Sequence, residues 1–358
     1  MKRALIAMSG GVDSSVAAYL MLKDGYECIG ATMKLYDNTD IGVSRSRTCC
    51  SADDIQDARG VAYKLGIPYY VFNFKDDFNE KVIKKFVESY ENGATPNPCI
   101  DCNRYLKFER MYTRAKEIDC DYIVTGHYAR IEEKDGRFLL KKSLNKAKDQ
   151  SYVLYAMTQE ELAHTKFPLG EIADKSAVRE LAEKADLANA EKPDSQDICF
   201  VPDGDYAKVI EHYTGKSYPK GDYIDTEGNV LGEHKGIIHY TIGQRRGLGI
   251  ALGKHMYVCD KNPENNTVTL GDISDLMKSE VNIESFNWIM YDKPPISFKA
   301  TAKLRYNQKQ EYPCTVFVDE NDISKVKLIL DEPQKAVAKG QAAVLYDGDY
   351  VIGGGTIL

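Results

Sequence analysis

The chain has 358 residues, of which 43% are hydrophobic and 28% charged, as is typical of a globular protein with two or three domains. Its 47 Lys and Arg residues against 54 Asp and Glu residues give a net charge of −7, which excludes a uniformly basic nucleic-acid coat but not local basic patches. No apolar run approaches the ~18 residues of a membrane span, and Ala4–Met8 is too short for a signal peptide. Nine cysteines are too few for a secreted disulfide scaffold, so we expect reduced thiols, a cytoplasmic protein and no membrane partner.

Short apolar runs alternate with helical segments over the first half of the chain, which predicts a parallel sheet with helices on both faces. The predicted strands and helices are, in chain order, Ala4–Met8, Val16–Leu22, Glu27–Met33, a helix from the N-cap Ser51 to Leu65, Tyr69–Phe72, Asp76–Tyr90, Arg104–Ile118 and Tyr122–Thr125. Ligands on such sheets bind beyond the carboxyl ends of the strands. We therefore expect functional residues directly after these strands.

The pattern changes after Gly126. Asp135-Gly136 indicates a hairpin, Asp174–Leu187 a further helix, and glycines, turns and β-branched residues dominate from about Tyr206. The remaining expected turns and strands are Asp225–Gly228, Asn262–Asn266, Phe298–Leu304, Thr315–Val318, Val326–Leu330, Ala342–Tyr346, Asp347-Gly348 and Tyr350–Ile352. We expect an α/β domain over residues 1–205, a small mixed domain over 206–278 and a β-barrel over 279–358.

The segment Ser9-Gly10-Gly11-Val12-Asp13-Ser14 lies between the first predicted strand and helix. Its glycines allow close backbone approach, so that successive N–H groups and the helix N-terminus can hold a phosphate chain. The segment lacks the Lys of the GxxxxGK[ST] loop. Asp13 beside phosphates needs a cation, and Mg²⁺ bridging to ATP oxygens would supply it.

The second informative segment is Thr95–Asn103, where two prolines precede a C-x-x-C formed by Cys99 and Cys102 at the start of a helix. The helix N-terminus and the nearby Arg104 and Lys107 favour thiolates, which could attack a persulfide, form a disulfide or bind metal. Cys199 is a distant third thiol, and Cys49-Cys50 is a vicinal pair. Half of a zinc site is the plainer interpretation of a single C-x-x-C.

With these segments together, the chain resembles the N-type ATP pyrophosphatases and, over essentially its whole length, the tRNA-specific 2-thiouridylases. The matching blocks are Ser9–Ser15, Cys49–Ser51 with Asp57–Arg59, Thr95–Asn103, Thr125–Ala129, Lys148–Tyr152, Lys192–Phe200 and His239–Gly249. The resemblance implies ATP-dependent 2-thiolation of the wobble uridine of the tRNA anticodon. ATP would adenylate the uracil C2 oxygen, pyrophosphate would leave, and sulfur would displace AMP.

The resemblance also implies a role for each matched residue. The residues implied to bind ATP are Ala7, Met8, Ser9, Gly10, Gly11, Val12, Asp13, Ser14, Met33 and Gly126. The residues implied to contact tRNA are Asn97, Pro98, Cys99, His127, Asp149, Gln150, Ser151, Arg305, Tyr306 and Gln341, of which the first three would border the target base. Cys199 would carry a persulfide sulfur delivered by a donor protein or sulfide source, and Cys102 would release it and form a disulfide with Cys199.

One departure affects the sulfur route. Many members of the family have Asp where this chain has Cys99. Cys99, Cys102 and Cys199 form a three-thiolate set that also suits a [4Fe–4S] cluster with one open iron. Both the persulfide and the cluster route therefore stay open.

RNA binding has to come from local charge. Basic residues gather in Arg104–Lys116, Lys299–Lys309 and Arg245-Arg246, although a solvated face explains any single run equally well. Two other classes of protein compete with the thiolase. An ATP pyrophosphatase that adenylates a small carboxylate or carbonyl leaves the cysteines unexplained, and a non-catalytic iron–sulfur or zinc RNA-binding protein leaves the phosphate loop unexplained.

Overall fold

The computed structural model describes residues 1–37, 40, 42, 52–187, 189, 190, 192, 198–251, 253–335 and 337–358. These residues form two compact units. Unit 1 comprises Met1–Val82, Cys99–Gly204 and Gly348–Val351, and unit 2 comprises Ile83–Pro98, Asp205–Asp347 and Ile352–Leu358. The predicted N-cap Ser51, the pair Cys49-Cys50 and residues 193–197 lie outside the described residues. The division into three domains stays a prediction.

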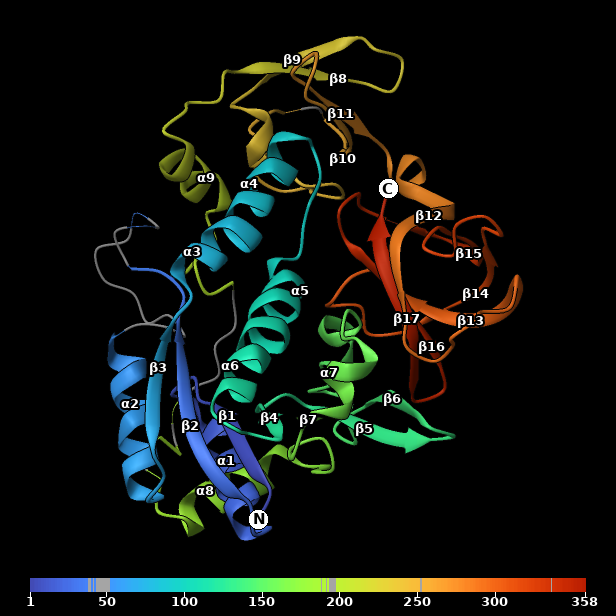
Figure 1. Ribbon diagram of the computed structural model, residues 1–358. Coiled ribbons are helices and arrows are strands. Elements are labelled where there is room, and N and C mark those ends of the chain that lie inside the picture. The colour runs from blue at the N-terminus through green and yellow to red at the C-terminus, as the bar shows by residue number, and fades with distance from the viewer. Residues whose placement is uncertain are drawn as a thin grey trace. The chain divides into compact units, whose positions relative to one another are not determined.

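Unit 1 is built on a five-stranded parallel sheet of order β3-β2-β1-β4-β7 (Figure 1). The strands are β1 (Arg3–Ala7), β2 (Glu27–Lys34), β3 (Tyr69–Asn73), β4 (Tyr122–Val124) and β7 (Thr165–Lys166). The first four confirm the predicted strands. In β1, the consecutive residues Ala4, Leu5 and Ile6 are fully buried, so this strand is covered on both faces.

Helices cover both faces of this sheet, as predicted. The helices α1 (Val12–Lys23), α2 (Ala52–Lys64) and α8 (Lys175–Lys184) pack against one face, where Ala4, Ile6 and Val124 share their core. The chain runs from β1 to β2 and β3 in one direction and then returns past β1 to β4. Because parallel crossovers are right-handed, the return connection lies on the other face.

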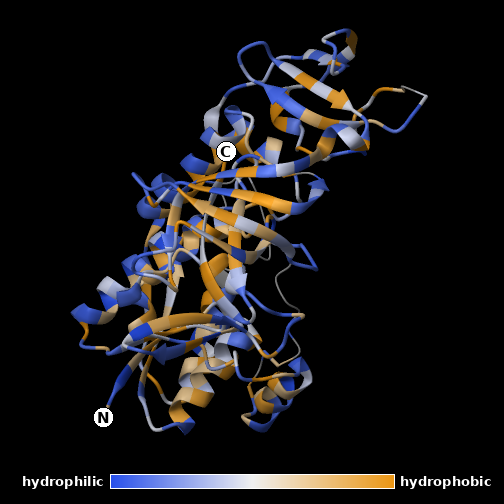
Figure 2. Cartoon of the chain, turned by 90° about the vertical axis from the view of Figure 1, so that its right-hand side faces the viewer, coloured by the Kyte–Doolittle hydropathy of each residue, from blue (hydrophilic) through white to orange (hydrophobic). Residues whose placement is uncertain are grey.

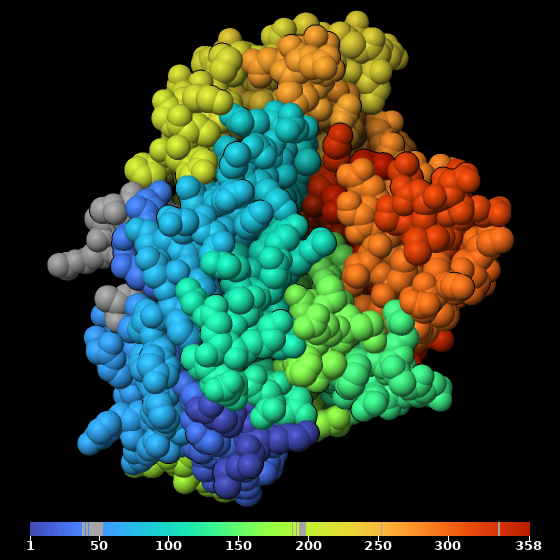
Figure 3. Space-filling model, in the orientation of Figure 1, coloured from blue at the N-terminus to red at the C-terminus, as the bar shows by residue number. Residues whose placement is uncertain are grey.

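The return connection is helical but not uniformly α-helical. The predicted helix over 76–90 consists of α3 (Lys75–Phe78), the π-helical segment η2 (Asn79–Ile83) and α4 (Lys84–Glu91). The predicted helix over 104–118 starts earlier, with α5 (Pro98–Asp101), the π-helical segment η3 (Cys102–Arg110) and α6 (Met111–Glu117). Side chains of the α5–α6 run lie at the surface of unit 1 (Figure 3).

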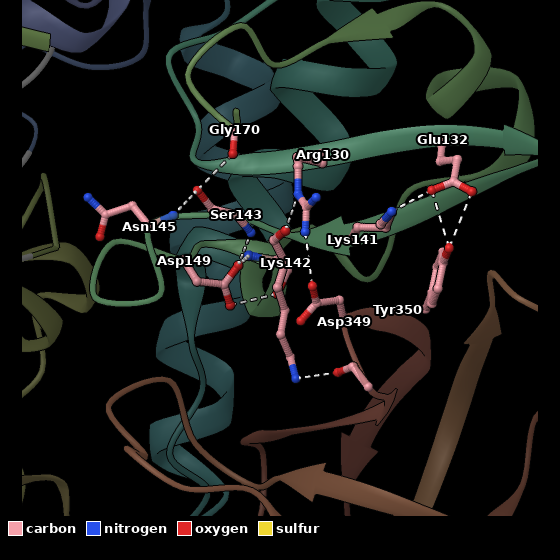
Figure 4. Close-up of polar contacts among 12 residues, drawn as sticks. Arg130, Glu132, Lys141, Lys142, Ser143, Asn145, Asp149, Gly170, Asp349 and Tyr350 are labelled. Carbon is pink, nitrogen blue, oxygen red and sulfur yellow. Dashed lines mark hydrogen bonds and ion pairs between the residues drawn. The ribbon is translucent and has the colours of Figure 1, made fainter. Parts of the chain in front are cut away.

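The hairpin signal Asp135-Gly136 is confirmed. It joins β5 (Ala129–Lys134) to β6 (Arg137–Lys142), and both turn residues have positive φ, 53° and 74°, as a type I′ turn requires. The hairpin leads into the short helices η4 (Ser151–Leu154) and α7 (Gln159–Ala163). Glu132 on β5 accepts hydrogen bonds from the Tyr350 hydroxyl and pairs with Lys141 (Figure 4).

The smaller part of unit 2 is a four-stranded sheet of order β10-β11-β8-β9. Its strands are β8 (Gly221–Ile224), β9 (Val230–His234), β10 (Tyr257–Asn262) and β11 (Thr267–Gly271), which confirms the predicted turns between them. The helix with which this region begins, α9 (Tyr206–Thr214), was not predicted from the sequence. Asp205 caps this helix by accepting a hydrogen bond from the Lys208 N–H, and Gly215 ends it at φ 64°.

The rest of unit 2 confirms the predicted β-barrel. The antiparallel strands run in the order β12-β15-β14-β13-β16-β17, and pairing between β12 and β17 closes the barrel. Their bounds are β12 (Met277–Trp288), β13 (Ser297–Lys303), β14 (Tyr312–Val318), β15 (Val326–Lys335), β16 (Ala342–Asp347) and β17 (Tyr350–Ile357). Alternate residues such as Val326, Leu328 and Leu330 fill the interior, and hydrophobic colour concentrates in the strands while most loops are hydrophilic (Figure 2). Among the described residues, no helix is long and apolar enough to cross a membrane.

Candidate active site

The site of unit 1 lies where the strand order reverses. The sheet extends from β1 to β2 on one side and from β1 to β4 on the other, so the strand order reverses between β1 and β4. Such a switch point at the carboxyl ends of parallel strands leaves a crevice for a ligand. The segment after β1 is the predicted phosphate loop, and the segment after β4 is Thr125–Tyr128.

The phosphate loop is fixed by hydrogen bonds among its own residues. Ser9 donates its N–H to Ser14 Oγ over 3.2 Å, and the Ser14 and Ser15 hydroxyls both donate to the Gly11 carbonyl over 3.0 Å. Gly10 has a φ of 73°, and a Cβ there would lie 2.5 Å from the Asp54 carbonyl oxygen. Glycine is therefore required for both conformation and space. The first N–H groups of α1 have no partner within the helix, so they point at a site suited to an anion.

Two residues after α8 support the loop and the helix α2 beside it. Asn189 donates from Nδ2 to the Gly10 carbonyl over 3.0 Å and to Ser15 Oγ over 2.8 Å. Lys192 bridges Asp54 and Asp57 of α2 over 2.7 and 2.6 Å. Sequence reasoning assigned neither residue a role. The only signal was that Lys192 opens the Lys192–Phe200 block.

The segment after β4 approaches the phosphate loop so closely that only glycine fits. A Cβ on Gly126 would lie 2.7 Å from both the Asp13 carbonyl carbon and the Ser14 nitrogen. Two residues on, the buried Tyr128 hydroxyl donates a 2.8 Å hydrogen bond to Asp13 Oδ1. The structure therefore brings together the predicted ATP-binding residues Asp13, Ser14 and Gly126. Tyr128 was missed, although it lies inside the Thr125–Ala129 block.

The predicted tRNA contacts Asp149, Gln150 and Ser151 make hydrogen bonds inside unit 1. Asp149 accepts from the Ser143 and Ser151 N–H groups over 3.0 and 3.3 Å and from Ser151 Oγ over 2.8 Å (Figure 4). Gln150 accepts from the Tyr128 N–H over 3.0 Å and donates its own N–H to the Tyr128 carbonyl. Ser151 is fully buried. These groups order the loop that supports Tyr128, and their contact with tRNA stays a prediction.

His127 is buried, with 8% of its surface exposed, although it was predicted to contact tRNA. Its Nδ1 lies 2.7 Å from Thr125 Oγ1, its Nε2 lies 3.4 Å from Lys107 Nζ, and Phe108 and Phe167 flank the ring. Burial, and then the charge of Lys107, hold the pKa of the imidazole well below its usual 6.5. The ring is therefore neutral at physiological pH. Its contact with tRNA stays a prediction.

The segments that carry the three candidate cysteines meet around α3. Cys99 is exposed near the start of α5, and the half-buried Cys102 opens η3, which an Arg110–Asp77 ion pair of 2.9 Å joins to α3. The Cys199 carbonyl accepts a 2.6 Å hydrogen bond from the Tyr36 hydroxyl. The rings of Phe200, Phe78 and Tyr36 then pack in sequence, with centroid distances of 5.7 Å. Within the described part of the chain, no group of three or more His, Cys, Asp or Glu side chains is arranged to hold a metal ion.

Of the other predicted site residues beyond the phosphate loop, Met33 belongs to unit 1 and the rest belong to unit 2. Met33 is nearly buried at the end of β2. In unit 2, Gln341 donates a 2.6 Å hydrogen bond to the Thr95 carbonyl, while Arg305 and Tyr306 are exposed on the loop between β13 and β14. Asn97 and Pro98 also belong to unit 2.

Gly126→Ala tests the close contact behind the nucleotide site. The added methyl group must displace either the phosphate loop or the segment after β4, so we expect ATP to bind about tenfold more weakly or worse, as calorimetry would show. Gly60→Ala is the matched control. Gly60 lies in helix α2 with nothing within 4 Å of an added Cβ, so this change should leave ATP affinity intact and stabilise the helix. Equal ATP affinities in the two variants would contradict the proposed contact.

The buried His127 predicts a pH dependence of stability. Below 6.5 the unfolded chain takes up a proton at this histidine and the folded chain does not, so the free energy of unfolding falls by about 1 kcal/mol for each further pH unit. Above 6.5 this contribution is constant. His127→Gln removes the titrating group, so its unfolding free energy should change less than that of the wild type between about pH 8 and pH 5 in denaturant titrations. Parallel pH profiles would show that the imidazole titrates normally.

The comparison with known proteins agrees with this geometry. The family model described as "tRNA methyl transferase HUP domain" matches residues 2–203, and the models for a PRC-barrel domain and an aminomethyltransferase β-barrel domain match residues 207–272 and 278–357. The tRNA-specific 2-thiouridylase MnmA of Clostridioides difficile is 51% identical over 99% of this chain and 98% of its own. The protein of the same name from Acetivibrio thermocellus is 51% identical over 99% of each chain.

Solved structures are more distant. A 4-thiouridine synthetase in complex with RNA and ATP is 19% identical, covers 60% of this chain and 50% of its own, and has a TM-score of 0.38, which is too low to carry a functional argument. The identity with the curated relatives is high and spans both units. The chain therefore belongs to the tRNA-specific 2-thiouridylase family.

Proposed function

We propose that this protein is a tRNA sulfurtransferase that uses ATP to convert the wobble uridine of the anticodon to 2-thiouridine. The observation that carries the proposal is the phosphate loop, which close packing at Gly10 and Gly126 fixes at the switch point of the sheet. The chain that contains it is 51% identical to a 2-thiouridylase. The first family model ends at residue 203 and the second begins at 207, while the second ends at 272 and the third begins at 278. These limits support the three-domain division proposed from the sequence. We place the enzyme in the cytoplasm, where its tRNA substrate would be.

The nucleotide would bind at the phosphate loop. Residues 9–14 and the start of α1 would hold the pyrophosphate part of ATP, and Met33 and Gly126 would border the adenosine. Asp13 would hold Mg²⁺, and its fit rests on a carboxylate that Tyr128 orients at the edge of this anion site. Bound Mg²⁺ would neutralise charge on the phosphate oxygens.

The chemistry balances with two thiols. The uracil C2 oxygen attacks the α-phosphorus of ATP, the bond to the β-phosphate oxygen breaks, and pyrophosphate leaves. The terminal sulfur of a Cys199 persulfide attacks C2, and the C2–O bond breaks to release AMP. The Cys102 thiolate then attacks Cys199 Sγ, which leaves the sulfur on C2 as a thiocarbonyl and oxidises the two cysteines to a disulfide. A dithiol reductant restores both thiols.

The tRNA would present its wobble base out of the anticodon stack, as base-modifying enzymes require. Asn97, Pro98 and Cys99 would border the base. His127, Asp149, Gln150, Ser151, Arg305, Tyr306 and Gln341 remain proposed tRNA contacts, although the burial of His127 and Ser151 limits them to contacts made through their backbones or after a rearrangement. A donor protein or a sulfide source would supply the sulfur.

An anaerobic thiolation assay tests the proposed function. It would contain unmodified tRNA, ATP, Mg²⁺ and a persulfide donor, with 2-thiouridine detected by retardation in a mercury-containing gel. We expect Cys199→Ser to reduce thiolation more than about a thousandfold while tRNA-dependent pyrophosphate release persists, because adenylation precedes sulfur transfer. Cys259→Ser is the matched control, since this half-buried cysteine of unit 2 has no proposed role, and it should thiolate normally.

Three results would contradict the account. Normal thiolation by Cys199→Ser would exclude Cys199 as the sulfur carrier. Thiolation that disappears when the protein is freed of iron would favour the route through a cluster on Cys99, Cys102 and Cys199. ATP cleavage to AMP with no retardation from any sulfur source would favour a synthetase that adenylates a small carboxylate or carbonyl.

A further inference from the structure

A cavity of about 570 Å³ lies in unit 2, in the loop between η5 (Ile237–His239) and β10. Four of the residues that line it are basic side chains, namely Arg245, Arg246, Lys254 and His255. The cavity shares no residue with the phosphate loop or with the segments that carry the three candidate cysteines. It is therefore a separate feature of the molecule that the proposed chemistry does not use.

The sequence around this cavity is cationic, although the chain as a whole has a net charge of −7. No Asp or Glu occurs between Glu233 and Asp260, a stretch that contains four Lys and Arg residues. Clustered charge of one sign attracts an oppositely charged ligand even on a protein whose net charge repels it. The cavity is therefore suited to an anion.

The two arginines have no counter-ion within the protein. Among the residues that the structure describes, neither guanidinium group makes an ion pair or a hydrogen bond, and both side chains are exposed. The exposed lysines of the same unit that pair with carboxylates differ in this respect, at distances of 2.9 Å for Lys216, 2.7 Å for Lys220 and 3.3 Å for Lys254. Arg245 and Arg246 can therefore offer all their N–H donors to an external anion.

The loop that carries the arginines is held in place by hydrogen bonds. The buried Tyr223 hydroxyl donates to the Leu248 carbonyl over 2.6 Å, and Gln244 Nε2 donates to the Arg246 carbonyl over 2.9 Å. The Gln244 carbonyl accepts from the Val258 N–H of β10 over 2.9 Å. The backbone on both sides of the arginines is therefore ordered before a ligand arrives, which lowers the entropic cost of binding.

Two glycines leave the backbone of this loop open to a ligand. Gly249 and Gly253 have φ values of 72° and 70°, and a Cβ on either would meet no atom within 4 Å. The space beside them is therefore free. A phosphate oxygen can approach the backbone N–H groups there as well as the arginine side chains.

These features fit the phosphate chain of RNA better than a small molecule. Most of the residues that line the cavity are exposed, so it would cover one side of a ligand without enclosing it. Arginine side chains and backbone N–H groups are typical donors to nucleic-acid phosphates. The basic run Arg245-Arg246, which the sequence alone explained equally well as a solvated face, lines a cavity in an ordered loop.

We propose that the cavity lined by Arg245 and Arg246 binds backbone phosphates of the tRNA substrate, in addition to the tRNA contacts proposed above. This inference rests on the proposed function, which makes tRNA the substrate. Phosphate contacts carry no sequence information, so this surface adds affinity and orients the tRNA without selecting its anticodon.

The test measures how tightly the full-length protein binds unmodified tRNA at several salt concentrations, without ATP or a sulfur donor. We expect Arg245→Gln/Arg246→Gln to bind about tenfold more weakly at ~100 mM salt. The plot of log association constant against log salt should become shallower by about one to two units, because fewer counterions are released. Arg245→Lys/Arg246→Lys keeps both charges and should retain most of the wild-type slope.

The matched control is Lys216→Gln/Lys220→Gln. It removes two exposed charges of the same unit that Glu91 and Glu233 already neutralise, so the affinity and the slope should stay as in the wild type. Inorganic phosphate, compared with chloride at constant ionic strength, distinguishes a free phosphate from an RNA chain. It should not displace tRNA, because a single phosphate lacks the linked contacts of a chain.

Three results would overturn the proposal. The arginine-to-glutamine variant could bind tRNA with the wild-type affinity and slope. Inorganic phosphate could displace tRNA from the wild type but not from this variant, as a site for free phosphate would require. The variant could lose binding of a polyglutamate peptide while it keeps that of tRNA, which would indicate an acidic protein partner. A wild type that binds no tRNA would overturn the proposed function as well, whereas a wild type that thiolates tRNA, beside an unaffected variant, would overturn this inference alone.

Discussion

The contact between two turns determines the nucleotide site. The turn after β1 and the turn after β4 leave the sheet at its switch point, and Gly126 lies against the Asp13 and Ser14 backbone with no room for a Cβ. This contact brings the first turn of α1 and the end of β4 to one place. The hydrogen bond from Tyr128 to Asp13 joins the same two turns, and Asn189 bonds the phosphate loop separately, at Gly10 and Ser15. The anion site therefore results from backbone packing more than from any one charged side chain.

The short segment Thr125–Tyr128 also joins the two halves of the proposed chemistry. Gly126 and Tyr128 face the phosphate loop, while Thr125 and His127 reach η3 through Lys107. Alternate residues of one extended segment point to opposite sides, so a single stretch can support both the nucleotide and the sulfur-bearing helix. Gln150 accepts a hydrogen bond from the Tyr128 N–H and donates one to the Tyr128 carbonyl, so the loop after β6 also holds this segment in place.

Local signals in the sequence were sufficient to predict many of the helices, strands and turns of the fold. Buried parallel strands read as continuous apolar runs, and turns such as Asp135-Gly136 need positive φ, so both were predicted correctly. Helix α9 was missed because its caps, Asp205 and Gly215, were overlooked within a glycine-rich region. Strand β12 was missed because most of its residues are polar and exposed.

The site could be predicted where the residue types of a short motif already determine what it binds, as the glycines and the helix N-terminus of the phosphate loop do. It was not predictable where the role depends on packing. His127 has the sequence context of a surface contact but lies between Phe108 and Phe167. No periodicity in the sequence indicates that η3 is a π-helix. Tyr128 and Asn189 reach the loop from segments more than a hundred residues away.

The central claim is that ATP activates the wobble uridine by adenylation of its C2 oxygen. Transfer of an ¹⁸O label from that oxygen tests this claim most directly. A tRNA carrying [2-¹⁸O]uridine at the wobble position would be thiolated with unlabelled ATP, and the AMP released would be examined by mass spectrometry. The account predicts one ¹⁸O atom in the phosphate of AMP for each 2-thiouridine formed. Unlabelled AMP accompanying 2-thiouridine would mean that ATP is cleaved without activating the base, and would contradict it.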